Sequence, residues 1–280
     1  MISETEAQQL LDSKDLIAIG MKADEVRRKL HGARTTFVRV FEIHVNALVT
    51  SLPPRTSAGE FRIVGSPRSL AEAIAAVRSA RSLSGAFPVS GFSLADLSKL
   101  DGAASVADTL RALHDEGLEE IAEVPLDGVD DARAAIAAVR GVGLSVRRLT
   151  VNAQRPDDRI VLANRARDLQ NEIGGFHAFA PLPRTISVSA PTTGYDDVKQ
   201  IALARMVADN IPSIQVDWQL YGPKLAQFAL TIGADDVDAV AAVDPGILGT
   251  RRSPIEEIRG NIRAAGLEPV ERNARFEAMG

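Results

Sequence analysis

Short apolar runs alternate with longer amphipathic runs along most of the chain. The short runs are typical of buried β-strands, and the longer runs repeat apolar residues at helical spacing. Two helices are predicted first, near residues 4–12 and 15–31, the second ending at Gly32. Strands are then predicted, with helices between them, over residues 35–45, 61–65, 86–91, 119–125, 145–152, 176–182, 213–219 and 237–243.

Residues that commonly cap helix N-termini precede several of the amphipathic runs. Their side-chain oxygens can accept hydrogen bonds from the first free backbone N–H groups of a helix. The candidates are Ser69, Ser105, either Asp127 or Asp130, and Asp157. These caps support the same alternation of strands and helices.

Eight strand–helix pairs after a helical lead-in predict an α/β protein with a (β/α)8 TIM-type barrel, either complete or partial and distorted. In this division residues 1–34 form an N-terminal helical extension, and residues 35–280 form the barrel and a C-terminal tail. An open doubly wound sheet is the alternative. It is less favoured because the turn after the first strand, NALVTSLPPRTSAG, lacks the GxGxxG pattern of dinucleotide-binding sheets.

Composition and charge argue against several classes of function. The net charge is −5 and the charged residues are spread along the chain, so no basic surface for DNA or RNA is expected. No basic segment precedes an apolar run near residue 1, and nowhere are 18 apolar residues consecutive, which predicts a cytoplasmic protein without a membrane partner. The chain contains no cysteine, which excludes disulfides, thiol nucleophiles and cysteine-ligated iron–sulfur clusters. HExxH, EF-hand, GxSxG and Walker-type patterns are absent as well, so no metal is expected.

Polar residues alternate with apolar residues in several predicted strands. Successive side chains of a barrel strand face the interior and the helices in turn, so one set in each strand should point inward. The inward sets are expected to be Gln215, Asp217 and Gln219 in 213–219, and Arg148, Thr150 and Asn152 in 145–152. Other strands offer Glu123, His177 with Phe179, and either Arg39 or Glu42.

Two interpretations of these inward polar residues remain open. They can satisfy one another as a buried network of ion pairs, or they can line a pocket for a polar ligand at the barrel mouth. For His177 alone a structural role is favoured. The other histidines, His31, His44 and His114, are expected at the surface or at helix ends.

Several segments of the C-terminal half resemble one enzyme family. The segments are LQNEIGGFHAFAPL (169–182), IALARMVADNIPSIQ (201–215), YGPKLAQFALTIGADDVDAV (221–240) and IRAAGLEPVERNARF (262–276). They resemble the radical S-adenosylmethionine family of menaquinone biosynthesis, specifically the aminofutalosine synthases. Cyclic dehypoxanthine futalosine synthases and deazaflavin synthase subunits are more distant relatives. Residues 15–32 also resemble the segment that precedes this family's first barrel strand.

The resemblance implies a CxxxCxxC loop after the first strand, where three thiolates would hold a 4Fe–4S cluster that cleaves S-adenosylmethionine. At these positions the chain has Leu48, Leu52 and Arg55, none of which can ligate iron. Near the fifth strand, Asn152 and Gln154 stand where the family has His and Glu. We therefore expect no cofactor: a 4Fe–4S cluster is not expected, and S-adenosylmethionine binding is in doubt.

Two functions are compatible with this resemblance. In the first, the chain is a cluster-free paralogue linked to futalosine-pathway menaquinone biosynthesis, which binds a nucleoside or a carboxylated aromatic intermediate without radical chemistry. In the second, it is a catalytically inactive subunit that associates with an active radical S-adenosylmethionine homologue, with Arg251, Arg252 and the C-terminal tail at the interface. Whether the chain is itself an enzyme stays open.

The residues expected to bind a ligand are inward polar residues and the carboxylates of the GADDVD motif. They are Arg148, Asn152, His177, Gln215, Asp217, Asp235, Asp236 and Asp238. For the GADDVD carboxylates a structural role is the favoured alternative, because Asp235 and Asp236 can start the last strand and cap the turn before it.

Overall fold

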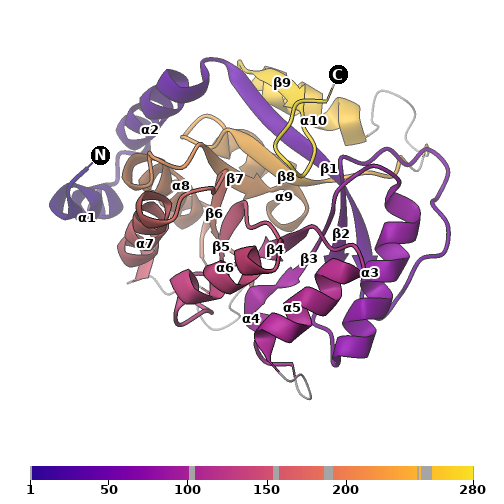
Figure 1. Cartoon of the computed structure of the whole chain (residues 1–280). Coiled ribbons are helices and arrows are strands. Elements are labelled where there is room, and N and C mark those ends of the chain that lie inside the picture. The colour runs from indigo at the N-terminus through magenta and orange to yellow at the C-terminus, as the bar shows by residue number, and fades with distance from the viewer. Residues whose placement is uncertain are drawn as a thin grey trace.

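The computed structural model is a barrel of parallel strands with helices around it (Figure 1). The structure describes residues 2–100, 105–153, 158–185, 192–244, 246 and 254–279. The barrel strands are β1 (Arg34–His44), β2 (Glu60–Val64), β3 (Val89–Ser93), β4 (Glu120–Glu123), β5 (Arg148–Val151), β6 (Ala178–Pro183), β7 (Ser213–Asp217) and β8 (Asp236–Ala241). Each of them overlaps a strand that the apolar pattern predicts.

The strands follow one another around the barrel in the order β4-β3-β2-β1-β8-β7-β6-β5. Two short parallel bridges join β4 to β5, between Glu120 and Ser145 and between Pro125 and Thr150. The backbone hydrogen bonds of these bridges are 2.9–3.0 Å long. Because the two strands that would be the edges of an open sheet are joined, the predicted barrel is confirmed and the doubly wound sheet is wrong.

Helices cover the outside of the barrel. They are α1 (Glu4–Asp12), α2 (Leu16–His31), α3 (Leu70–Ser84), α4 (Leu94–Leu97), α5 (Val106–Asp115), α6 (Ala132–Gly141), α7 (Arg159–Glu172), α8 (Gly194–Val207), α9 (Trp218–Ala229) and α10 (Pro254–Ala264). Their buried sides pack on the apolar side chains that the strands direct outward, such as Ile63, Leu149 and Ile214. Within the described ranges, no helix is long and apolar enough to cross a membrane.

Two of the predicted N-caps have the expected contacts, and one prediction is wrong. Ser69 and Ser105 accept hydrogen bonds from the backbone N–H groups of Glu72 and Asp108, at 3.3 and 3.1 Å. Helix α6, however, is capped by Asp131, which accepts from the N–H of Ala134 at 2.9 Å. Asp157, the candidate before α7, lies outside the described residues.

Asp127 joins two strand ends instead of capping a helix. Its carboxylate accepts hydrogen bonds from the backbone N–H groups of Asn152 and Ala153, at 2.7 and 2.6 Å. These contacts tie the loop after β4 to the chain that leaves β5, next to the bridge that closes the barrel. The sequence around Asp127 looks like a helix start, because an amphipathic run follows it. It does not reveal the contact with Asn152, which lies 25 residues away in sequence.

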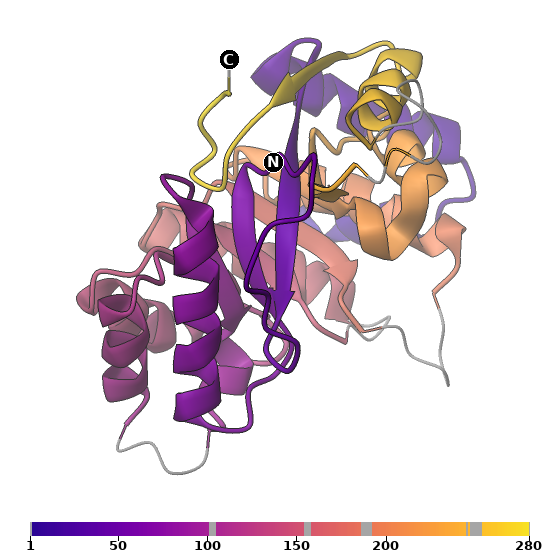
Figure 2. The same cartoon turned by 90° about the vertical axis from the view of Figure 1, so that its right-hand side faces the viewer.

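A ninth strand that the sequence pattern did not predict, β9 (Glu268–Glu271), pairs with the first residues of β1. Figure 2 shows β9 and the segment after it at the end of the barrel where the strands begin. Arg272 continues this path, and its N–H donates to the carbonyl of Phe37 at 2.9 Å. The last described residues therefore cover the N-terminal end of the barrel rather than its mouth.

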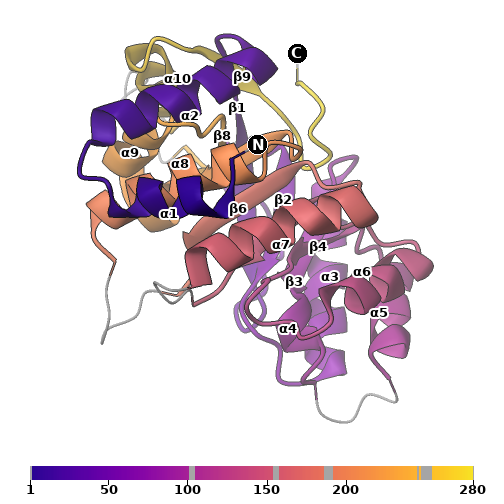
Figure 3. The same ribbon diagram turned by 90° about the vertical axis from the view of Figure 1, so that its left-hand side faces the viewer.

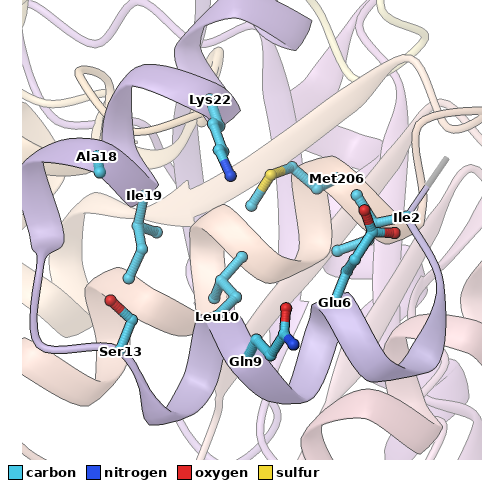
Figure 4. A pocket seen from close by; sticks show the side chains of 9 residues that line it. All are labelled: Ile2, Glu6, Gln9, Leu10, Ser13, Ala18, Ile19, Lys22 and Met206. Atoms are coloured by element: carbon cyan, nitrogen blue, oxygen red, sulfur yellow. The ribbon is translucent and has the colours of Figure 1, made fainter.

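Helices α1 and α2 pack against α8, and α1 also contacts α7 (Figure 3). A second apolar cluster holds them there, with Leu10 and Ile19 packing against Leu203 and Met206. A groove of about 290 Å³ lies between these helices (Figure 4). Met206 lies at its centre and the amine of Lys22 points into it, but the groove contains none of the predicted ligand-binding residues.

Candidate functional site

Charged side chains fill much of the barrel interior. Asp238 of β8 accepts hydrogen bonds from both terminal nitrogens of Arg62 on β2, at 2.9 and 2.7 Å, and it also accepts from Arg148 of β5. Arg62 in turn donates through Nε to Glu60 at 2.7 Å. These four side chains are nearly inaccessible to solvent. Three strands from different parts of the sequence thus meet at one carboxylate.

The balance between burial and charge decides the protonation state of Asp238. Burial disfavours its charged form, but the charges of Arg148 and Arg62 and the hydrogen bonds from Arg62 outweigh burial and hold the pKa of Asp238 well below its usual range. The same carboxylate and Glu60 raise the pKa of Arg62, against the opposing effect of burial. These directions favour the charged forms of both Asp238 and Arg62.

Asp236 forms a second buried ion pair nearer the start of the strands. Arg272, from the segment after β9, donates to both of its oxygens at 2.6 Å. Gln215 of β7 and Thr36 of β1 donate to the same carboxylate at 2.6 and 2.5 Å. Every oxygen of Asp236 is thereby engaged, which fits the structural interpretation of this residue better than a ligand-binding one.

The barrel mouth holds a cavity of about 240 Å³, which Arg62, Glu123, Asn152 and Arg184 help to line. Arg184 follows β6 and pairs with Asp217 at the end of β7. Its Nε lies 3.4 Å from Glu123, and its second terminal nitrogen lies 3.6 Å from Asp238. Burial disfavours the charge of Arg184, but Glu123, Asp217 and Asp238 outweigh it and raise the pKa of the guanidinium.

Two nitrogens of the Arg184 guanidinium lack hydrogen-bond acceptors among the described residues. Its Nε and Nη2 are buried, and neither makes a hydrogen bond to any residue that the structure describes. The neighbouring carboxylates lie within ion-pair distance but not in hydrogen-bond geometry. Because buried donors without acceptors are costly, this arrangement favours an additional anionic or carbonyl acceptor at the mouth.

Asp235 lies at the opposite end of the barrel from Arg184. It accepts hydrogen bonds from the buried Arg205 and from the N–H of Ile214, and its second oxygen is 3.2 Å from His31 Nε2. Burial raises the pKa of Asp235, while Arg205 and His31 act in the opposite direction. The expectation that His31 is only a surface or capping residue is therefore incomplete, because this histidine contacts a buried carboxylate.

His177 does not point into the barrel with Phe179, as the alternation suggested. It precedes β6 at the N-terminal end of the barrel, where its ring stacks on Phe276 with 5.1 Å between the ring centroids. Phe179 is aligned with Leu149 and Ile214, whose side chains face the helices. The inward residue beside Arg148 is Ala178. The sequence could not set this register, because a shift of one residue exchanges the two faces of a strand.

One other predicted inward position is wrong, and the open alternative on β1 is resolved. Gln219 belongs to α9, because β7 ends at Asp217, which caps that helix by accepting from the N–H of Leu220 at 2.8 Å. Of the two candidates on β1, Glu42 is aligned with Arg62 and faces inward. Arg39 points away and pairs with Glu271 of β9 at 2.7 Å.

Asn152 lies at the rim of the mouth, where its side chain accepts a hydrogen bond from Thr185 at 2.8 Å. Arg148, Gln215 and Asp238 come together in the interior, since Arg148 donates to Gln215 at 3.2 Å as well as to Asp238. The predicted ligand set thus divides among the mouth, the interior and the N-terminal end. Gln154, Arg251 and Arg252 lie outside the described residues.

The loop after β1 does not fit a cysteine-ligated cluster. Leu48 and Leu52 are 45% and 38% exposed, Arg55 is exposed as well, and none of the three lines the mouth cavity. Two aliphatic side chains and a guanidinium offer no thiolate for iron. Among the described residues, moreover, no three His, Asp or Glu side chains are grouped as a metal site would require.

Several polar and charged residues of this network were not among the predicted site residues. They are Thr36, Glu60, Arg62, Arg184, Arg205 and Arg272. Glu60 and Arg62 alternate with apolar residues in GEFRIV, so the rule used for 213–219 would have found them. Arg184 follows a strand and Arg272 lies in the tail, and no local pattern distinguishes them from surface arginines.

Comparison with solved structures finds the same barrel fold in a methylornithine synthase and in an FeFe-hydrogenase maturase. Methylornithine synthase superposes with a TM-score of 0.65 over 96% of this chain and 94% of the other, at 14% identity. The FeFe-hydrogenase maturase from Carboxydothermus hydrogenoformans superposes with a TM-score of 0.64 over 98% of this chain and 77% of the other, at 13% identity. At such low identity the likeness concerns the fold alone.

Sequence comparison is more specific. Residues 177–279 match the family model described as CofH/MqnC C-terminal region. The aminodeoxyfutalosine synthase of Streptomyces coelicolor is 32% identical over 165 residues, which cover 51% of this chain and 43% of that protein. The cyclic dehypoxanthine futalosine synthase of the same organism is 28% identical over 200 residues, covering 62% and 50%. These matches confirm the resemblance, although the chain spans half or less of the length of these curated relatives.

Replacing Asp238 with Asn tests the role of the central carboxylate. The change leaves Arg62 and Arg148 buried beside an uncharged amide, so we expect the free energy of unfolding to fall by about 3–5 kcal/mol. Urea unfolding of wild type and D238N measures this difference. Asp108→Asn, which removes an exposed carboxylate paired with Arg111, is the matched control and should change stability little. Equal stability of D238N and wild type would contradict the assigned role.

Proposed function

We propose that this chain is a cluster-free relative of the aminofutalosine synthases that binds a nucleoside or a carboxylated aromatic intermediate of futalosine-pathway menaquinone biosynthesis in the mouth cavity, without radical chemistry. The main support for this proposal is the state of Arg184. This residue lines the cavity, and two of its buried nitrogens have no acceptor in the described part of the chain. A carboxylate can accept from both nitrogens of a guanidinium at once.

Other residues around the cavity suit the remaining groups of such a ligand. Ser66 donates to Asp96 at 2.5 Å, and both line the cavity on the side of β2 and β3. Hydroxyl and carboxylate groups of this kind can hydrogen-bond to sugar hydroxyls. Phe92 offers an apolar wall, and its backbone has a φ of 63°, a strained conformation that occurs most often at functional sites. Polar groups converging on a partly apolar wall are typical of small-molecule sites.

The absence of cysteine from the 280 residues supports the second half of the proposal. A ligand-binding role requires only the barrel and its mouth, whereas reductive cleavage of S-adenosylmethionine requires a cluster. The charged interior below the cavity fixes Arg62 and Arg184 in place through Asp238 and Asp217. Binding therefore meets a preorganised pair of guanidinium groups.

We expect aminodeoxyfutalosine to raise the melting temperature of the protein. A ligand that binds only the folded state adds about 2.7 kcal/mol at a hundredfold excess over Kd. In Arg184→Gln this gain should largely disappear, because the guanidinium donors are lost. Differential scanning fluorimetry of both proteins, with and without ligand, measures the effect.

Two further variants separate binding from folding. Arg184→Lys keeps the charge beside Asp217 but loses the paired donors of the guanidinium. It should therefore fold as wild type does but bind aminodeoxyfutalosine more weakly. Arg133→Gln removes a 68% exposed arginine of α6 that lies outside the cavity lining, and it should respond to ligand as wild type does. The proposal fails if aminodeoxyfutalosine leaves the wild-type melting temperature unchanged, or if R184Q responds as strongly as wild type.

The cluster-free half of the proposal has its own test. Anaerobic reconstitution with iron and sulfide should yield no charge-transfer absorption and no stoichiometric iron, because Leu48, Leu52 and Arg55 provide no thiolate. A cysteine-bearing relative treated in parallel serves as the positive control. Iron and sulfide bound at about four atoms of each per chain would overturn this part of the proposal.

A partner subunit is the second candidate function, and one surface feature favours it. Ile17 and Met21 lie one turn apart on α2 and are 77% and 70% exposed. Adjacent exposed apolar side chains are common at protein interfaces. The partner that covers these two side chains would be a cysteine-bearing radical S-adenosylmethionine homologue from the same organism.

Size-exclusion chromatography of the purified pair tests this second function. We expect wild type to elute with the homologue, and the double variant Ile17→Glu, Met21→Glu to elute alone, since two charges would be buried in the interface. Two separate peaks for the wild-type mixture would rule out this function while leaving the ligand proposal untouched.

A further inference from the structure

A second cavity lies at the N-terminal end of the barrel, opposite the mouth. It has a volume of about 140 Å³ and opens between the start of β1, the chain before β6 and β7, and the segment after β9. Its polar lining includes His31, Arg34, His177, Ser213, Asp235 and Arg272. Two residues of the lining, Arg272 and Thr36, also contact Asp236 of the interior network.

The two carboxylates at this end are already neutralised. Asp235 is paired with the buried Arg205 and is also contacted by His31. Asp236 is held by both donors of Arg272. Each carboxylate therefore has its own guanidinium, and these pairs leave no surplus negative charge at the cavity.

Arg34 is the remaining cation of this cavity. Its guanidinium makes no hydrogen bond or ion pair with any residue that the structure describes. In the same described part of the chain, the ring nitrogens of His177 and the hydroxyl of Ser213 also have no hydrogen-bond partner. The cavity thus combines one unpaired positive charge with neutral donors.

The position of His177 is set by the segment after β9. Its ring stacks on Phe276, and Arg272 lies 4.0 Å above the same Phe276 ring. Phe276 has a φ of 63°, which is strained for a residue with a side chain. Asn273 supports this turn, since its carbonyl accepts from the N–H of Phe276 at 3.2 Å. Backbone strain of this kind is found preferentially where a site is held in a fixed shape.

We infer that the cavity at the N-terminal end is a binding site for a small tetrahedral oxyanion, such as a phosphate or sulfate group, held by Arg34, His177 and Ser213. The Arg34 guanidinium provides two parallel donors and the charge. His177 and Ser213 provide the further donors that an oxyanion accepts. This site is separate from the mouth cavity and does not depend on the function proposed for it.

Binding should depend on pH through His177. Partial burial lowers the pKa of His177, and the charges of Arg147 and Arg272 lower it further. The charged and titratable groups around this ring are Arg147, Arg272, Arg34, His31 and Asp235. An anion beside the ring favours the imidazolium, so it raises the pKa of His177, and by linkage the oxyanion binds more tightly as the pH falls.

NMR titration of the full chain with sulfate tests the inference, because sulfate stays doubly charged in the range below about pH 6.5, where His177, with its lowered pKa, changes protonation. The four imidazole signals are assigned with single His→Gln variants. We expect sulfate to shift the His177 signal, to raise its pKa, and to bind more tightly at the lower pH. Inorganic phosphate should produce the same shift, and acetate, which is planar and singly charged, a weaker one.

Variants locate the site. Arg34→Gln, which removes an exposed side chain without partners in the described residues, should weaken sulfate binding about tenfold or more. His177→Gln should bind sulfate with little dependence on pH. In Arg133→Gln and Arg184→Gln, sulfate should shift the His177 signal as in wild type, and the second of these separates this site from the mouth. The inference is overturned if sulfate on the order of tens of millimolar leaves the His177 signal unmoved, if R34Q binds as tightly as wild type, or if R184Q abolishes binding.

Discussion

The neutralisation of Asp236 and Asp238 inside the barrel is the constraint on which the rest of this structure depends. Transferring a carboxylate from water to a buried position costs several kcal/mol, and only partners at hydrogen-bond distance can offset that cost. Arg62 and Arg148 come from β2 and β5 to meet Asp238, and Arg272 comes from the tail to meet Asp236. The barrel strands and the tail must therefore be assembled together for either carboxylate to be buried in charged form.

This central network separates two ends with different chemistry. Arg184 at the mouth is held by Asp217 and still has buried donors without acceptors in the described residues. At the other end the tail brings Phe276 against His177, and Arg34, which has no partner among the described residues, lines the same cavity. The ion pairs in the middle engage their own partners, so the nitrogens of Arg184 and Arg34 that lack acceptors in the described residues lie at the two cavities, where a ligand can reach them.

The barrel fold is one that known enzymes also have, whereas the loop after β1 of this chain carries no cysteine. The barrel superposes on those of a methylornithine synthase and a hydrogenase maturase, and residues 177–279 match the CofH/MqnC C-terminal region. The loop after β1, by contrast, exposes Leu48 and Leu52 to solvent and lies away from the mouth cavity. These two aliphatic side chains, together with Arg55, offer no thiolate for iron.

The sequence by itself determined the barrel, because the alternation of short apolar runs and amphipathic helices is a local property that survives any error in register. It also determined that Leu48, Leu52 and Arg55 offer no thiolate, since this depends only on residue identity. Only the tertiary structure decided which polar groups meet. The register of β1 against β2 directs Glu42, and not Arg39, into the interior. His177 and Gln219 lie outside the interior because β6 begins after His177 and β7 ends before Gln219. Arg184 and Arg272 acquired their partners through contacts 33 and 36 residues away in sequence, which no local pattern can reveal.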